Sequence, residues 1–212
     1  MRFSAFTFGM ALALGTAAAL ASPSPAELDP ALLRNGDIIF QTSRSGQSQA
    51  IQLATHSQYS HCGVIFFKRG KPYIFEASTQ VKQTPLKRFV KKGEGGRCVI
   101  KRLGNADSLL TPENLVKLEK AGKAFEGLPY DTFFGWGDDR IYCSELVYKI
   151  YRNALGIEIG KTAILKDFDL SAPETRRVMA LKYGTAIPMD ETVIAPAAQF
   201  ADTSLVEVFN NY

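Results

Sequence analysis

The stretch that decides the fold is DDRIYCSELV at residues 138–147, which places Cys143 at the start of a predicted helix. Apolar residues follow Cys143 at the spacing of one helix face, so we expect the cysteine to face the interior together with Val147, Ile150 and Tyr151. The free N–H groups and the positive dipole end at a helix start lower the pKa of a thiol. The sequence therefore predicts a nucleophilic cysteine on a helix that ends at Gly156.

A thiolate nucleophile needs a base and a group that orients the base. The chain has two histidines, His56 and His61. His61 lies in an apolar, β-rich segment at residues 59–67, and the chain returns antiparallel after a turn, with Glu76 near the end of the second strand. Facing residues in this hairpin have numbers that sum to about 139, so His61 and Glu76 form a diagonal pair on one face. We expect Glu76 to hold one ring nitrogen of His61 and Cys143 to meet the other.

Each of these residues also has a structural interpretation. A histidine in a strand is more often structural than catalytic, a buried glutamate can pair with a lysine, and a helix-start cysteine can be inert core. Together they favour catalysis, because a carboxylate in an apolar strand is costly without a partner.

Zinc binding is the rival use of Cys and His. His56, His61 and Cys62 lack the paired spacing of zinc ligands, and no second cluster completes four. No metal and no cofactor are therefore expected, and His56 is expected at a surface or a helix end.

Residues 1–21 have the features of a secretory signal peptide. Arg2 is the basic residue, residues 6–20 are largely apolar, and Ala19-Leu20-Ala21 is a small-x-small cleavage site. The alternative is a membrane anchor, but the apolar run is short for a span. We expect cleavage after Ala21, a periplasmic or secreted protein, and one domain over residues 22–212 whose C-terminal extension wraps the surface.

The mature chain contains three cysteines, Cys62, Cys98 and Cys143. An odd number in an exported protein leaves at least one thiol free. Cys62 and Cys98 either form a disulfide or are two buried thiols, and the sequence does not decide between them.

Composition excludes several classes of protein. The chain is 46% hydrophobic and 22% charged, which is typical of a globular domain. Its formal net charge of +4 is dispersed, so nucleic-acid binding is not expected, and membrane contact is not indicated. The local basic cluster is interpreted as a solvated face and comprises Lys87, Arg88, Lys91 and Lys92.

The remaining pattern predicts alternating helices and strands. Strands are expected at residues 37–41 and 97–103, the second nearer a sheet edge, with a basic segment at residues 82–92 between them. Helices are expected at residues 47–55 and 111–125, the latter capped by Thr111. A capping box, Ser171 to Glu174, is expected to start a further helix that ends near residue 183.

An ordered set of motifs resembles the YiiX/YebB-like family of permuted papain-like (NlpC-related) cysteine hydrolases. The resemblance covers almost the whole chain from Leu33 onward, and the histidine precedes the cysteine, as in the permuted group. Cys62 departs from the family pattern, in which an aliphatic residue is expected. The motifs are Leu33-x-x-Gly36-Asp37-Ile38-Ile39-Phe40, Tyr59-Ser60-His61-x-Gly63-Val64, Phe75-Glu76-Ala77, Pro129-Tyr130-Asp131 and Tyr142-Cys143-Ser144-Glu145-Leu146-Val147.

The resemblance implies an α+β fold with a circularly permuted papain-like (NlpC-like) core, in which the cysteine helix packs on a small antiparallel sheet or barrel. It implies Cys143 as nucleophile, His61 as general base and acid, and Glu76 as the orienting residue. The backbone N–H of Cys143 is the expected oxyanion donor, and Tyr59 or Tyr142 is the candidate for the second.

Three functions remain open at this stage. The first is an exported cysteine amidase or peptidase that cleaves a small peptide or cell-wall amide. The second is a lipid acylhydrolase or acyltransferase with the same triad, in which the aromatic residues 133–136 line an acyl groove. The third is a non-catalytic binding protein on the same scaffold, which the retained triad disfavours.

Overall fold

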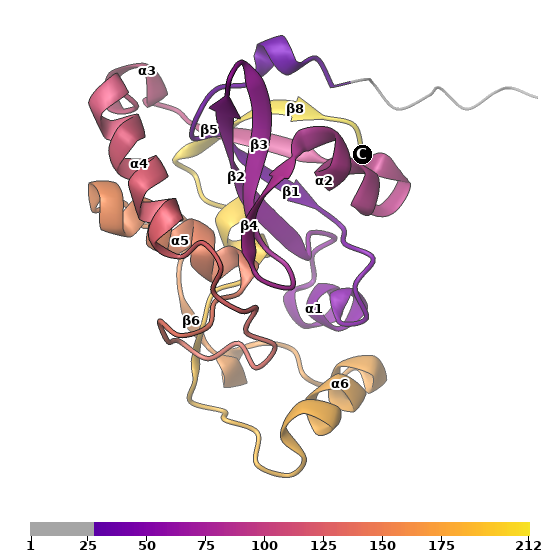
Figure 1. Cartoon of the computed structure of the whole chain (residues 1–212). Helices are drawn as coiled ribbons and strands as arrows, with labels where there is room; N and C mark the ends of the chain where they lie inside the picture. Colours follow the sequence, from indigo (N-terminus) through magenta and orange to yellow (C-terminus); the bar gives the residue numbers. More distant parts are fainter. Residues whose placement is uncertain (1–27) are drawn as a thin grey trace, which may run out of the picture.

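A six-stranded antiparallel sheet forms the centre of the molecule, in the strand order β4-β3-β2-β1-β5-β8 (Figure 1). The computed structural model describes residues 28–212, so the predicted signal peptide lies outside the described residues. The strands are β1 (Ile38–Gln41), β2 (His61–Lys68), β3 (Lys71–Ala77), β4 (Val81–Pro85), β5 (Val99–Leu103) and β8 (Leu205–Asn210).

Helices cover the sheet and extend below one end of it (Figure 1). They are α1 (Ser48–Thr55), α2 (Leu86–Lys92), α3 (Ala106–Leu109), α4 (Pro112–Ala124), α5 (Cys143–Leu155), α6 (Pro173–Tyr183) and α7 (Pro196–Phe200). A small two-stranded sheet pairs β6 (Ala163–Ile164) with β7 (Thr192–Val193). Short 3-10 turns lie at Pro30–Leu32, Glu94–Gly96 and Leu165–Asp167.

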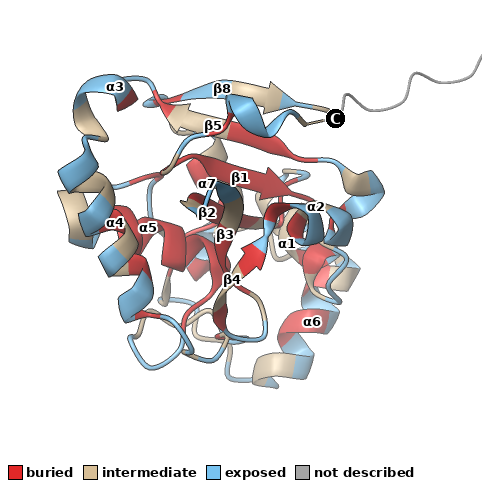
Figure 2. Cartoon of the chain, turned by 45° about the horizontal axis from the view of Figure 1, so that its top comes forward, coloured by how far each residue is buried: buried red, intermediate tan, exposed pale blue. Residues whose placement is uncertain are grey.

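Strand alternation gives the sheet two buried faces. Phe40, Cys62 and Val64 belong to the core that contains Val147 and Ile150 of α5. Ile39, Ile65 and Ile74 point to the opposite face and pack in a second core with Phe89 of α2. Both faces are therefore covered, as the apolar run in β2 predicted, and in Figure 2 the central strands and α5 are largely buried.

The predicted hairpin register is confirmed. Val64 faces Phe75 and Ile65 faces Ile74, so the paired residue numbers sum to 139. Gly63 allows the strands to approach, because a Cβ there would lie 2.5 Å from the Ile74 side chain and 2.6 Å from the Phe75 carbonyl oxygen. Gly63 therefore lets β2 pack closely against β3 just after His61 and Cys62.

Two of the predicted helix caps are confirmed and a third is wrong. Gly156 caps α5 with a φ of 69°, and the Thr111 side chain accepts a hydrogen bond from the Asn114 N–H at the start of α4. The predicted capping box at α6 is wrong, because Ala172 is the capping residue and the Ser171 hydroxyl donates to Asp169 instead.

Three further expectations need correction or completion. The C-terminal extension does more than wrap the surface, because it supplies β8, and this strand makes β5 an inner strand of the sheet. The basic segment at residues 82–92 is β4 followed by α2, on which Lys87, Arg88 and Lys91 are exposed as expected, whereas Lys92 reaches the buried Glu76. Cys62, Cys98 and Cys143 are all buried free thiols, so there is no disulfide between Cys62 and Cys98.

Candidate active site

Cys143 is the first residue of α5, and its neighbours fix it there. Tyr142 is the extended residue before the helix, and its N–H donates to the Glu145 carboxylate over 3.3 Å. The Tyr142 hydroxyl accepts the N–H of Ile194 over 3.0 Å. Cys143 is only 3% exposed, and its backbone N–H belongs to the first turn, where no acceptor exists within a helix.

His61 is the first residue of β2 and so lies at the end of the sheet. Its Nε2 atom lies 2.7 Å from Glu76 Oε2, as the diagonal pairing predicted, which leaves Nδ1 for the Cys143 sulfur. The thiol of Cys143 lies close enough to the ring of His61 for each group to shift the pKa of the other, and the ring stacks on Phe89 at 5.4 Å. The structure therefore brings Cys143, His61 and Glu76 together.

Glu76 is fully buried but has partners on both oxygens. Oε2 faces His61, while Oε1 accepts from the Thr84 hydroxyl at 2.5 Å and from Lys92 Nζ at 3.1 Å. Burial alone would raise the pKa of Glu76, but the contacts to His61, Thr84 and Lys92 outweigh it and lower the pKa to about 2. Glu76 is therefore a carboxylate at any working pH.

The charges of Cys143 and His61 support each other. A hydrogen bond from Cys62 and the positive charge of His61 lower the pKa of Cys143 well below 9.0, against the effect of burial. Burial would lower the pKa of His61, but the negative charges of Cys143 and Glu76 outweigh it and raise the pKa to about 10. The two shifts together favour a thiolate on Cys143 paired with an imidazolium on His61.

The two tyrosines considered as oxyanion donors serve other contacts. The Tyr59 hydroxyl accepts from Gln58 Nε2 over 3.1 Å, and its ring packs 4.1 Å from that of Phe200. Tyr142 uses its hydroxyl on Ile194, although its ring lies beside the cysteine. Both side chains are therefore placed as packing residues.

Tyr130 lies in the Pro129-Tyr130-Asp131 motif, which does not by itself mark it as a site residue. Its hydroxyl accepts from Gln47 Nε2 over 2.9 Å, so its own proton remains for another acceptor. Burial, followed by the nearby negative charge of Cys143, raises its pKa well above 10.0, so the hydroxyl stays protonated. Tyr130, unlike Tyr59, also lines the space beside Cys143 and His61, so it is the better-placed donor.

Gln199, in α7, is a second site residue that the sequence did not reveal. It is fully buried, and its Nε2 donates to the carbonyl oxygens of Ser144 and Ile159 at 2.9 and 3.3 Å. Its Oε1 lies 3.4 Å from the Cys62 sulfur, and Cys62 also hydrogen-bonds Cys143. Gln199 thus ties the first turn of α5 to the strand that carries His61.

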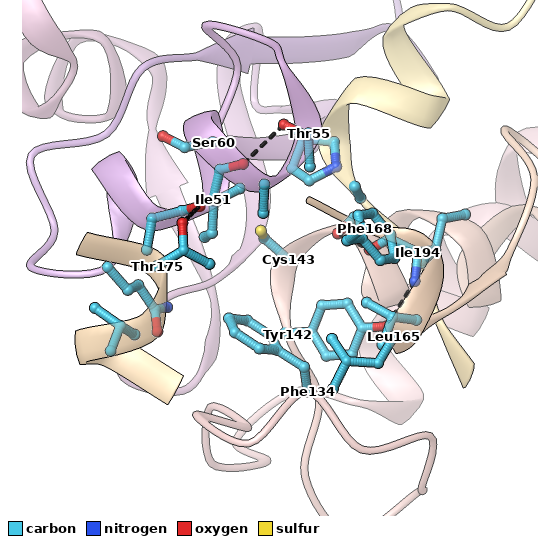
Figure 3. Close-up of a pocket in the computed structure, with 18 of the residues that line it drawn as sticks. Ile51, Thr55, Ser60, Phe134, Tyr142, Cys143, Leu165, Phe168, Thr175 and Ile194 are labelled. Carbon is cyan, nitrogen blue, oxygen red and sulfur yellow. Dashed lines mark hydrogen bonds between the residues drawn. The ribbon is translucent and has the colours of Figure 1, made fainter. Parts of the chain in front are cut away.

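Two cavities meet at the triad. One, of about 80 Å³, is lined by Cys143 and by apolar side chains from α1, α6 and the segments around β6 and β7. Figure 3 shows the Cys143 sulfur facing the space between Ile51, Phe134 and Ile194. The other is an open groove of about 720 Å³ lined by His61 and Glu76. Gln47, Ser60 and Tyr130 line both cavities.

Residues 32–209 match the family model described as permuted papain-like amidase enzyme, YaeF/YiiX, C92 family. The chain belongs to this family. It is therefore a cysteine amidase or peptidase-type hydrolase with an α+β, permuted papain-like fold.

Two relatives support the assignment. The uncharacterized protein YiiX of Escherichia coli K12 is 48% identical over 175 residues, which covers 82% of this chain and 85% of that protein. A crystal structure titled metalloprotein yiiX from Escherichia coli O157:H7 has a TM-score of 0.81 and 47% identity, and it covers 84% of this chain and 98% of that one. Within residues 28–212 of this chain, no group of three or more His, Cys, Asp or Glu side chains could hold a metal ion. The described residues also contain no helix that is long and apolar enough to span a membrane.

Proposed function

We propose that this chain cleaves an amide bond by covalent catalysis with Cys143 as nucleophile, His61 as general acid and base, and Glu76 as the residue that orients His61. One observation carries the proposal: the His61 ring interacts both with Cys143 and with the buried carboxylate of Glu76, which lies 2.7 Å from its Nε2. This is the nucleophile, base and orienter arrangement of acyl transfer.

The reaction follows from these contacts. The Cys143 thiolate attacks the carbonyl carbon, and the C–N bond breaks as His61 gives its proton to the amine nitrogen. The product is a thioester on Cys143 and a free amine. His61 then takes a proton from water, whose oxygen attacks the thioester and releases the acid and the thiolate. Glu76 keeps the ring oriented through both steps.

The oxyanion of the tetrahedral intermediate needs two donors. The Cys143 backbone N–H supplies one, because it lies at the start of α5. We assign the second to the Tyr130 hydroxyl in place of Tyr59 or Tyr142, because Tyr130 is the tyrosine that lines both cavities at the triad.

The place of action is proposed from residues 1–21 alone. Their signal-peptide features support export to the periplasm or beyond, where cell-wall peptides and lipid amides are both available substrates. No nucleic acid and no cofactor enter the proposal.

The test compares Cys143→Ala with Cys98→Ala on a mixture of muropeptides and acyl amides. Cys98 is a matched control, because it is also a buried free thiol but packs in the other core. We expect Cys143→Ala to lose at least about 10⁴-fold in rate and Cys98→Ala to retain activity. Hydrolysis that persists in Cys143→Ala would exclude this mechanism. A wild-type chain that has no activity and whose Cys143 is unreactive would revive the binding-protein alternative.

A further inference from the structure

Tyr130, the proposed oxyanion donor, is the end of a short chain of hydrogen-bonded side chains. The Gln47 Nε2 atom donates to the Tyr130 hydroxyl oxygen over 2.9 Å. The other end of the same amide, Gln47 Oε1, accepts from Lys182 Nζ over 2.7 Å. Gln47 lies at the start of α1 and Lys182 in the last turn of α6, so the chain joins two helices to the tyrosine.

Lys182 fixes the direction in which the Gln47 amide faces. The oxygen and nitrogen of an amide exchange places when the group turns by half a revolution, and Oε1 would then accept the tyrosine proton. An ammonium group has donors only, so an amide nitrogen turned toward Lys182 would meet no acceptor. Burial lowers the pKa of Lys182 to about 8 against the charge of Asp131, which leaves the ammonium form in excess at pH 7. Oε1 is therefore held toward Lys182 and Nε2 toward Tyr130.

Lys182 is itself held in place by two further contacts. Its Nζ donates to the Thr132 carbonyl oxygen and lies 4.0 Å from the centre of the Phe134 ring. Both residues belong to the loop that follows Tyr130, so the lysine and the tyrosine are attached to the same segment. The orientation of the Gln47 amide therefore depends on a fixed charge and not on a freely moving side chain.

A tyrosine that accepts from an amide N–H turns its own proton away from that amide. Tyr130 lines both cavities at the triad, so its proton is left for a substrate atom in the space beside Cys143 and His61. We propose that Lys182 and Gln47 are positioning residues for the oxyanion: Lys182 orients the Gln47 amide, and this amide keeps the Tyr130 hydroxyl a donor to the substrate. The inference rests on the proposed function and adds two residues to it.

The pair formed by Gln58 and Tyr59 shows what the lysine adds. Gln58 Nε2 donates to the Tyr59 hydroxyl over 3.1 Å, in the same direction as Gln47 donates to Tyr130. Gln58 is exposed, however, so water can serve either end of its amide. Tyr59 packs on Phe200 and does not line either cavity at the triad. Gln58 is therefore a matched control for Gln47.

Gln47→Glu is the most direct test, because it keeps the shape of the side chain and the contact with Lys182. A carboxylate has no N–H, so its second oxygen takes the Tyr130 proton and withdraws it from the oxyanion. We expect kcat to fall at least about tenfold with little change in KM, since loss of one oxyanion donor costs about 10²- to 10³-fold. The melting temperature should be unchanged or higher, because an ion pair with Lys182 is gained. Gln58→Glu should keep the wild-type kcat.

A double-mutant cycle with Tyr130→Phe separates this effect from that of the added negative charge. Tyr130→Phe alone should lower kcat about 10²-fold. In the Tyr130→Phe background, Gln47→Glu should change kcat less than about twofold, because the hydroxyl through which it acts is absent. An undiminished effect of Gln47→Glu in that background, or a wild-type kcat in Tyr130→Phe, would overturn the inference.

Variants of Lys182 test the other end of the chain. Lys182→Met should lower kcat about fivefold to tenfold, because the Gln47 amide is then able to turn. Lys182→Arg should restore kcat, since a guanidinium group also has donors only. Arg176→Met removes an exposed cation from the same helix and should have no effect. A wild-type kcat in Lys182→Met, or a loss of kcat that follows the melting temperature and is not restored by Lys182→Arg, would contradict the positioning role.

Two probes, octanoyl-4-nitroanilide and muramyl dipeptide, separate failure of this inference from failure of the proposed function. Kinetics are measured on the probe that the wild-type chain cleaves faster, with Cys143→Ala as the blank. If cleavage depends on Cys143 but Gln47→Glu and Lys182→Met match the wild type, only this inference fails. If the wild-type chain cleaves neither probe, or Cys143→Ala cleaves as fast as the wild type, the proposed function fails and this inference fails with it.

Discussion

Cys143 and Cys98 are both buried free thiols, yet their environments give them opposite chemistry. Burial alone acts on Cys98, just before β5, and it raises the pKa of that thiol to about 12. Cys143 is as deeply buried, but the hydrogen bond from Cys62 and the contact with His61 outweigh burial and lower its pKa. Partners that favour the charged form, and not exposure, therefore decide which thiol is reactive.

The largest expected effect is on alkylation. Iodoacetamide should modify Cys143 at least about 10³-fold faster than Cys98 in the folded chain at neutral pH, because only the thiolate reacts. Since the pKa of Cys143 is lowered, its labelling should persist as the pH falls below 9 and decline only near the lowered pKa. Peptide mapping by mass spectrometry measures the labelling rate of each cysteine. Equal rates for Cys143 and Cys98 would contradict the predicted difference in reactivity.

Removal of the charge on Glu76 should reduce the difference in reactivity between Cys143 and Cys98. Glu76→Gln deprives His61 of the carboxylate that helps raise its pKa to about 10, so the imidazolium and hence the thiolate become less stable. We expect kcat/KM to fall about 10²- to 10⁴-fold. The acid limb of the pH profile for Cys143 labelling should move to higher pH.

Glu94→Gln is the control for this change, because Glu94 is exposed in the turn after α2. It should leave the rate and the labelling profile as in the wild type. A Glu76→Gln chain with an unshifted labelling profile would show that Glu76 does not act through His61.

A smaller effect is expected at Gln199, which acts through its neighbours and touches no reacting atom. Gln199→Ala removes the buried amide that donates to the Ser144 and Ile159 carbonyls and removes one acceptor from the Cys62 thiol. We expect about tenfold lower activity and a loss of about 1–3 kcal/mol in the free energy of unfolding.

The alkylation profile separates positioning from mere stability. The single Cys62 thiol proton has two acceptors, Gln199 and Cys143, so losing one changes the support of the thiolate. The labelling profile of Gln199→Ala should shift, whereas Gln83→Ala, on the outer surface of β4, should leave it unchanged. A stability loss with an unshifted profile would make Gln199 a purely structural residue.

Local patterns were enough to predict much of the site. The position of Cys143 followed from helix periodicity, and the contact of His61 with Glu76 followed from the numbering of one hairpin. Both depend on short-range geometry, in which residue spacing determines which side chains meet.

Long-range contacts could not be predicted in the same way. Gln199 and the residues that line the 80 Å³ cavity beside Cys143 come from segments distant in sequence. No helix or strand periodicity relates these segments to one another. The edge strand β8 was missed for the same reason, since its partner β5 lies far upstream. Tyr130 is different, because its motif was visible but the sequence did not say which tyrosine would line both cavities at the triad.

The contact of Gln199 with the first turn of α5 has a consequence for the order of folding. The hairpin and the cysteine helix are complete once residue 155 has been made, but the buried amide that joins them arrives only with α7. During synthesis, a chain that ends before α7 lacks this tie. The tie between Cys62 and the first turn of α5 therefore forms only after α7 has been made.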